Sequence, residues 1–76
     1  MSRHKPDYRV IAYKSDPTIA DTLPDALREL LRLHYIDGNK WCDVADIMHY
    51  SIENIFLLRR QALYKLEVVI NGSKKE

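Results

Sequence analysis

Apolar residues recur at helical spacing through the middle of this chain, and two short turn-forming stretches divide the pattern. Between residues 23 and 66 they return every three or four positions, as on one face of an α-helix. The dividing stretches are Asp37-Gly38-Asn39-Lys40 and His49-Tyr50-Ser51. Both contain residue types that commonly end or begin helices. The sequence therefore predicts three amphipathic helices joined by two tight turns.

Residues at both ends of the first predicted helix fit the preferences of helix boundaries. The helix begins near Leu23, where Thr22 is the expected N-cap and Pro24 fits the first turn. It stops at Gly38, because a residue without a Cβ readily takes the positive φ that a helix end needs.

The second and third predicted helices are bounded in the same way. The second runs from about Lys40 to Met48, with Asn39 as its expected N-cap. Ser51 caps the third helix through its hydroxyl, and that helix continues to Asn71-Gly72. Apolar residues on the inner faces of the three helices form the expected core: Leu27, Leu30, Leu31, Leu33, Tyr35, Trp41, Val44, Ala45, Met48, Ile55, Leu58, Ala62 and Leu66.

Residues 1–22 lack this periodicity and are predicted to form a short, partly extended N-terminal arm. The segment Tyr8–Tyr13 is rich in β-branched and aromatic residues, which favour a strand or an extended segment packed on the domain. Pro6 and Pro17 flank it and disfavour a helix. The predicted organisation is an arm over residues 1–22, an all-α domain over 23–70 and a polar C-terminal tail over 71–76.

The net charge of +1 conceals an uneven distribution along the chain. Counting Lys and Arg against Asp and Glu, residues 1–14 carry +3, residues 15–50 carry −4 and residues 51–76 carry +2. Both ends are therefore basic and the middle is acidic. This distribution suits a domain that meets phosphate groups with its last helix and a terminal arm.

Several classes of function are not expected. The 76 residues make one small domain with little room for a deep catalytic cleft. The sequence has no Gly-rich phosphate loop, nucleophile elbow or Walker pattern, so we do not expect an enzyme. Cys42 is the single cysteine and no histidine stands at ligand spacing from it, so neither a metal nor a cofactor is expected. His34 and His49 are expected to be solvated or to cap helices.

No apolar stretch has the length of a membrane span or of a signal peptide. A span needs a run of roughly 18 apolar residues, and none occurs. The basic residues near the N-terminus are not followed by an apolar segment. With a single cysteine, these features favour a cytoplasmic protein that does not contact a membrane.

Several short patterns between Leu31 and Leu66 occur together in a known family. They are Leu31-x-x-x-Tyr35-Ile36-Asp37-Gly38, an aromatic residue three positions before Val44-Ala45, the Tyr50-Ser51 turn, an apolar residue four positions after Ser51, and Ala62-Leu63 followed by Leu66. With these features residues 23–66 resemble the helix-turn-helix of region 4 of bacterial sigma factors. They are more similar still to the sigma-region-4-like domain of phage transcriptional activators of the ArpU type.

The resemblance implies a three-helix helix-turn-helix domain that binds double-stranded DNA and regulates transcription in a phage or bacterium. The last helix of such a domain lies in the major groove. Carried over by position, its DNA-facing residues are Ile52, Glu53, Asn54, Phe56, Leu57, Arg60, Gln61, Tyr64 and Lys65. The candidate phosphate contacts are Arg3, Lys5, Arg9, Lys40, Ser51 and Arg59.

Three of these positions depart from the family, whose reading face is mostly Arg, Glu, Gln, Tyr and Lys. Ile52, Phe56 and Leu57 are apolar here. Three explanations are open, namely contacts with thymine methyl groups, cover by the Tyr8–Tyr13 segment, or an interface with a protein. The alternative function is therefore a protein-interaction module of the same fold. Such a module would bind RNA polymerase or another host protein, or form a homodimer.

Overall fold

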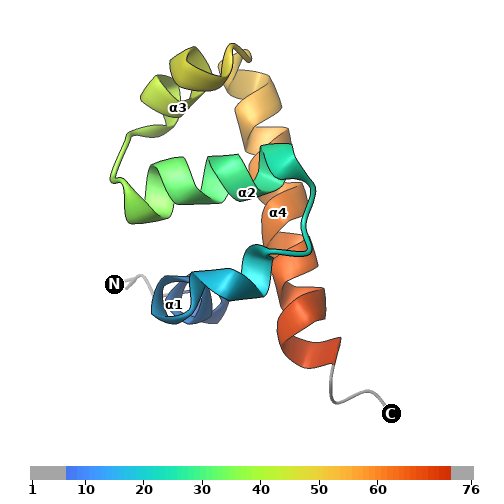
Figure 1. The fold of residues 1–76 in the computed structure, drawn as a ribbon. Helices are drawn as coiled ribbons and strands as arrows, with labels where there is room; N and C mark the ends of the chain where they lie inside the picture. The colour runs from blue at the N-terminus through green and yellow to red at the C-terminus, as the bar shows by residue number, and fades with distance from the viewer. Residues whose placement is uncertain (1–6, 73–76) are drawn as a thin grey trace, which may run out of the picture.

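The computed structural model describes residues 7–72, which are built from helices (Figure 1). No strand occurs within that range, and the prediction of an all-α domain is confirmed. In chain order the elements are α1 (Tyr8–Ser15), the 3₁₀ turn η1 (Pro17–Ala20), α2 (Asp25–Leu31), the π turn η2 (Arg32–Ile36), α3 (Trp41–Met48) and α4 (Ile52–Gly72).

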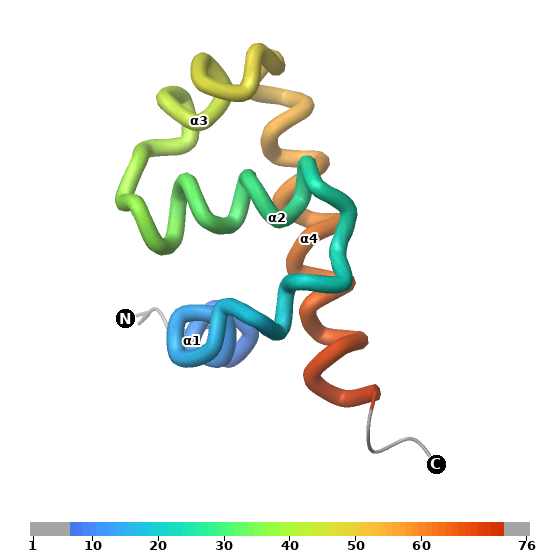
Figure 2. The backbone as a smooth tube through the Cα atoms, viewed as in Figure 1, coloured from blue at the N-terminus to red at the C-terminus, as the bar shows by residue number. Residues whose placement is uncertain are grey.

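The long helix α4 lies along one edge of the molecule, and the other helices pack on one side of it (Figures 1 and 2). α3 lies near the N-terminal end of α4, α2 crosses its middle, and α1 lies toward its C-terminal half (Figure 2). The 21 residues of α4 span about 30 Å, so α1, α2 and α3 can all pack against this one helix. Within residues 7–72 no helix combines the length and apolar character needed to cross a bilayer.

The core lies between α4 and these helices. Leu30, Leu31, Val44, Ile55 and Leu66 are the largest fully buried side chains. They come from α2, α3 and α4, so the predicted inner faces of the three helices do meet. The other buried residues are Tyr13, Ala20, Leu23, Leu27, Leu33, Ala45, Ala62 and Leu63, with Tyr35, Trp41, Met48 and Leu58 half-buried against the cluster.

Residues 8–15 form helix α1, so the predicted strand or extended arm is wrong for this segment. Asp7 caps the helix, because its carboxylate accepts a hydrogen bond from the Arg9 backbone N–H. Tyr13 is buried in the core, and Val10, one helical turn earlier, packs against it. Burial of this side of α1 outweighs the preference of Tyr, Val and Ile for strands. The segment therefore folds as part of the domain.

The first predicted helix consists of α2 and the π turn η2. Pro24 occupies the N-cap of α2 without a side-chain hydrogen bond, so the predicted Thr22 cap is wrong. The Leu23 N–H donates to the Ala20 carbonyl and closes a turn, so the helix begins only after Pro24. Gly38 follows η2 with a φ of +85°, as predicted for a helix stop.

Of the two N-caps predicted at the starts of α3 and α4, one is wrong and one is confirmed. Lys40, rather than Asn39, is the N-cap of α3. The Asn39 side chain instead donates to the Leu33 carbonyl at 3.0 Å and closes the loop after η2. The predicted Ser51 cap is confirmed, because the Asn54 N–H donates to Ser51 Oγ at 3.2 Å. α4 continues to Gly72, the last residue that the structure describes, so the predicted helix stop at Asn71-Gly72 stays a prediction.

Candidate nucleic-acid interface

Residues 49–51 join α3 to α4 in a tight turn. His49 ends α3 with a φ of 64°, a left-handed conformation that few residues other than glycine adopt. Its N–H donates to the Asp46 carbonyl, and the Tyr50 N–H donates to the Ala45 carbonyl at 3.0 Å. Bonds of this kind satisfy the last carbonyl groups of a helix. The turn thus sets where α4 begins relative to α3.

Buried side chains hold α3 against α4. Val44 and Ala45 on α3 belong to the same core cluster as Ile55 on α4. Ala45 is small, which allows the two helices to approach closely. Because Ile55 points into this core, the opposite side of α4 points outward.

Trp41, the first residue of α3, is surrounded by side chains from η2 and α4. The His34 ring stacks on the indole with 3.7 Å between ring centres, and Phe56 meets it edge-on at 6.4 Å. The guanidinium carbon of Arg59 lies 5.9 Å from the centre of the indole. His34 Nδ1 also lies 2.7 Å from the Asn39 carbonyl oxygen. His34, expected to be solvated or to cap a helix, is therefore part of an aromatic cluster that ties α3 to α4.

The outward side of α4 carries most of the candidate DNA-facing residues. Ile55, Ala62 and Leu66 are buried, and residues about 180° away around the helix are open to solvent. Ile52 and Phe56 are exposed at the border of this open side. The candidates exposed on the open side itself are Glu53, Asn54, Leu57, Arg60, Gln61, Tyr64 and Lys65.

Phe56 and Leu57 do not form one continuous apolar patch. Consecutive residues of a helix point about 100° apart. Phe56 turns toward Trp41, whereas Leu57 lines a shallow groove with Tyr50 and Gln61. The arm does not cover either residue, because α1 packs elsewhere and the two side chains stay 46% and 52% exposed. Cover by the Tyr8–Tyr13 segment is therefore wrong.

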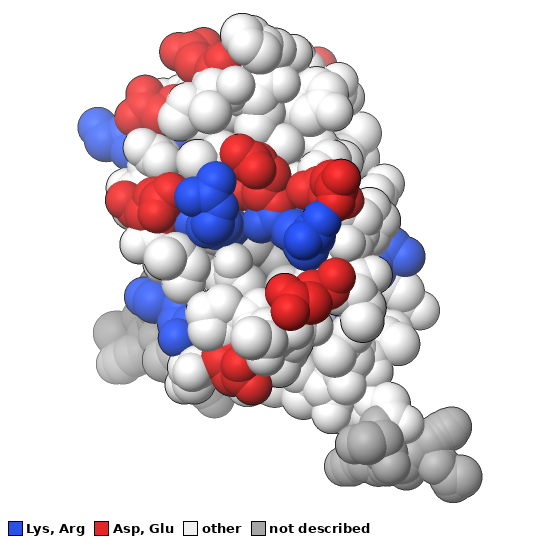
Figure 3. Space-filling model, viewed as in Figure 1, with Lys and Arg blue, Asp and Glu red and all other residues white. Residues whose placement is uncertain are grey.

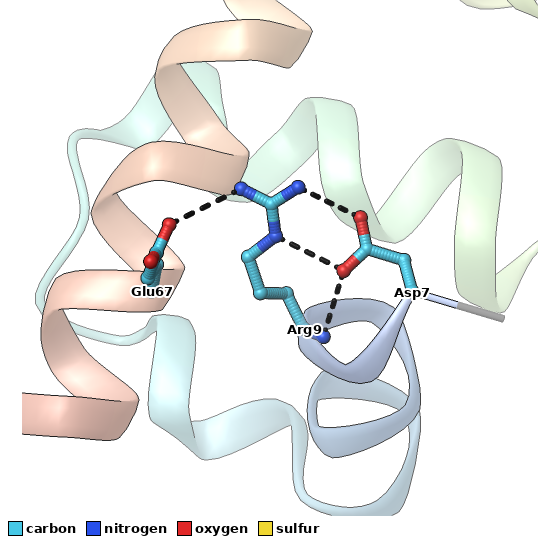
Figure 4. A network of polar contacts seen from close by, with 3 residues as sticks. All are labelled: Asp7, Arg9 and Glu67. Carbon is cyan, nitrogen blue, oxygen red and sulfur yellow. Dashed lines mark hydrogen bonds and ion pairs between the residues drawn. The ribbon is translucent and has the colours of Figure 1, made fainter. Parts of the chain in front are cut away.

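The Arg9 side chain is paired within the molecule (Figure 4). Its Nη2 lies 2.8 Å from Asp7 Oδ2, and its Nε lies 3.0 Å from Asp7 Oδ1. Its Nη1 lies 3.5 Å from Glu67 Oε1 on α4. The hydrogen bond from Arg9 lowers the pKa of Asp7 below its ordinary value. Arg9 thus fastens α1 to α4, and two carboxylates already balance the charge that was expected to meet phosphate.

The other candidate phosphate contacts are scattered. Lys40 and Ser51 are exposed at the starts of α3 and α4. Arg59 is half-buried over the indole described above. Arg3 and Lys5 lie outside the described residues. The structure therefore gathers the base-facing candidates on α4 but does not gather the phosphate candidates beside them.

Acidic side chains outnumber basic ones over the described residues. Residues 7–72 contain eight Lys or Arg and ten Asp or Glu, a net charge of −2. Figure 3 shows a face across α2 on which the two kinds stand side by side. On this helix and η2, Arg28 pairs with Asp25, and Arg32 pairs with Glu29 at 3.3 Å and with Asp37 at 3.0 Å. This face is balanced by its own ion pairs and offers no basic patch.

Four exposed basic side chains form no ion pair within residues 7–72: Arg60 and Lys65 on α4, Lys14 on α1 and Lys40 just before α3. α3, by contrast, presents Asp43 and Asp46 to solvent and contains no Lys or Arg. A polyanion would therefore meet attraction at α4 and repulsion at α3.

Over the same residues, no three His, Cys, Asp or Glu side chains gather closely enough to hold a metal ion. Cys42 is exposed on α3. Comparison of the chain with protein-family models, curated proteins and solved structures found no match.

Proposed function

We propose that this protein binds double-stranded DNA through the outward side of α4 and regulates transcription in a phage or bacterium. One observation carries the proposal. Seven residues selected from the sequence as DNA-facing are exposed along one side of a helix that follows α3 and a three-residue turn. Two helices joined by such a turn are the usual means of presenting a helix to the major groove.

The exposed side chains supply the chemistry of base recognition. Asn54 and Gln61 are amides, which pair with adenine through two hydrogen bonds. Arg60 has the planar guanidinium that pairs with guanine in the same way. Glu53 accepts from the cytosine amino group, and Leu57 suits a thymine methyl group. Lys65, farther along α4, suits a phosphate.

The charge distribution sets the expected character of this binding. A chain of net charge +1, with −2 over residues 7–72, gains little from the general attraction between a protein and the phosphate backbone. Asp43 and Asp46 on α3 also oppose close approach to phosphate. Binding therefore depends on a few direct contacts from α4, and it is weak on random sequence.

Fluorescence anisotropy with labelled duplex DNA at low salt tests the proposal. We expect Arg60→Ala to weaken binding about fivefold to tenfold, because one charge-assisted contact is worth about 1–1.4 kcal/mol. Lys14→Ala is the matched control, since it removes one exposed cation from α1 and should change binding less than twofold. Wild-type binding no tighter than that of an acidic control protein, without salt dependence, would refute the proposal.

A second candidate is a protein-interaction module that contacts RNA polymerase or another host protein. The observation that favours it is the exposure of Ile52, Phe56 and Leu57, which are 39%, 46% and 52% exposed. Leu57→Arg separates the two functions, because it adds a cation to a DNA-binding face but places a charge in an apolar interface. Ile11→Arg on α1 is the control, since Ile11 is 51% exposed. Tighter DNA binding by Leu57→Arg alone favours the first function, whereas loss of protein association favours the second.

A further inference from the structure

The apolar surface of the domain is concentrated on α4. Among the described residues, α4 carries six of the eleven large apolar side chains that are exposed. Leu57, Tyr64 and Val68 are the most exposed of these six, at 52%, 64% and 51%. No other helix lies beyond α4 at that edge of the molecule (Figures 1 and 2). Together with Gln61, these three side chains form an exposed, mainly apolar strip over about three helical turns.

This strip has the spacing of a helix-pairing seam. Leu57, Gln61, Tyr64 and Val68 follow one another at intervals of four, three and four residues. They fall within an arc of about 60° around the helix. Residues spaced alternately by three and four positions occupy the a and d positions of a heptad, through which two helices pack side by side. We call these four residues the outer seam.

A shallow groove lies beside each half of the outer seam. Tyr50, Asn54 and Leu57 line the groove at the N-terminal half. Pro24 and Val68 are among the residues that line the groove at the C-terminal half. In an antiparallel pair of α4 helices each groove faces the opposite half of the partner's seam. A side chain of one seam can then fill a groove of the other, as knobs fill holes.

Charges beside the outer seam distinguish antiparallel from parallel pairing. Arg60 and Glu67 stand on one edge of the seam, two helical turns apart, and Lys65 stands on the other edge. Antiparallel pairing, with Leu57 opposite Val68 of the partner subunit, brings Arg60 opposite Glu67 of the partner subunit, twice by symmetry. Parallel pairing brings Arg60 opposite Lys65 of the partner subunit, which is repulsive. Glu67 is accessible for this role, because its side chain is 45% exposed and its contact with Arg9 is long, at 3.5 Å.

We propose that a second copy of this chain packs antiparallel on the outer seam of α4, aligned by two Arg60–Glu67 pairs. The seam is self-complementary in shape and in charge, as a two-fold interface requires. The interface is small and its ion pairs are exposed, so the dimer forms at micromolar rather than nanomolar concentration. The seam includes Leu57, Gln61 and Tyr64 of the proposed DNA-binding face, so a second copy and DNA compete for α4. The dimer itself does not depend on DNA binding.

Sedimentation equilibrium of the whole chain without DNA tests the dimer, so the result is independent of the proposed function. The average mass should rise from 9.0 kDa toward twice that value as the concentration increases through the micromolar range. Arg60→Glu and Glu67→Arg should each raise the dissociation constant about tenfold, because each creates two like-charge contacts. The double variant R60E/E67R should return it to within about threefold of the wild type. Lys14→Glu, an equal change of charge on α1, should have no such effect.

Circular dichroism of each variant verifies that the helices remain intact. A wild type that stays at 9.0 kDa throughout would overturn the proposal. So would tighter association of Arg60→Glu, which parallel pairing requires, or a double variant as weak as the single variants. Tyr64→Glu provides a second test that needs no buried change, since this side chain is 64% exposed. It should leave the protein folded and monomeric.

Discussion

Asp7 shows how one polar residue organises a segment whose composition favours a strand. Its carboxylate accepts hydrogen bonds from the Arg9 backbone and side chain, and Arg9 in turn reaches Glu67 on α4. The same residue therefore begins α1 and links it to the rest of the fold. Tyr13 then completes the attachment by burial in the core.

The Asp7 cap gives a prediction about stability. Asp7→Ala removes both the cap and the ion pair and should lower the free energy of unfolding by about 1–2 kcal/mol. Asp7→Asn is the matched control, because an amide oxygen still accepts the Arg9 N–H, and it should cost less. Urea unfolding followed by circular dichroism measures both values. Equal losses in the two variants would show that the cap itself contributes little.

The pKa of Asp7 predicts the pH range of this contribution. Arg9 holds the pKa of the folded state below the ordinary value of 3.8, which applies to the unfolded chain. The contribution is therefore complete above that ordinary pKa and is lost as the pH falls through the lower, folded value. The stability difference between wild type and Asp7→Asn should stay constant above about pH 5 and shrink below about pH 4. A difference that grows in acid would contradict the assignment.

At the scale of elements, the sequence predicts best where the signals are local. Ser51 caps α4 and Gly38 stops η2, because a cap or a positive φ depends on a few neighbouring residues. α1 was not predictable from strand propensity, because its stability comes from packing against residues far along the chain. The Asp7 cap and the i, i+3 pair Val10 and Tyr13 were the available signals for it.

The candidate site likewise contains features that the sequence predicts and features that it does not. The exposure of Arg60 and Gln61 follows from the helical repeat once Ile55 is known to be buried. The stacking of His34 on Trp41 depends on the loop between η2 and α3, and no spacing in the sequence specifies that loop. The fold class and the open side of α4 were therefore predictable, whereas the aromatic cluster beside them was not.

Gly38 gives a prediction for the element that precedes α3. A Cβ at Gly38 or at Gly72 would meet no atom within 4 Å, but only Gly38 has a positive φ, of +85°. Gly38→Ala should therefore lower the free energy of unfolding by about 1 kcal/mol through backbone strain alone. Gly72→Ala, at the end of α4, should change it by less than about 0.5 kcal/mol. Equal effects in urea unfolding would show that the loop adapts to a side chain.

At the scale of the whole molecule, α4 both completes the core and carries the candidate binding surface. One side of this helix closes the core against α1, α2 and α3, and the other side is open (Figure 1). The acidic and basic groups of α2 and η2 are paired with one another, so that face is not a site for polyanions. The open side of α4 is thus the surface on which we propose that the domain meets a macromolecule.

Competition for α4 gives a prediction that joins the two proposals. Val68→Asn disrupts the outer seam without changing any candidate DNA contact. In an anisotropy titration it should shift half-saturation of duplex DNA to a total protein concentration a few times lower, because less protein is held as dimer. Ile11→Asn on α1 is the control and should not shift it. A monomeric Val68→Asn variant with an unchanged DNA curve would show that the two surfaces do not overlap.

The most direct measurement is a map of backbone amide shifts by nuclear magnetic resonance as duplex DNA is added at low salt. Binding through α4 predicts that the largest shifts fall between residues 53 and 65, on the exposed positions, with Arg60 and Gln61 among the strongest. It also predicts that α2 and η2, whose charges are paired, remain nearly unchanged. Shifts confined to α1 and α2, or no shifts at DNA concentrations that saturate a known helix-turn-helix protein, would contradict the account.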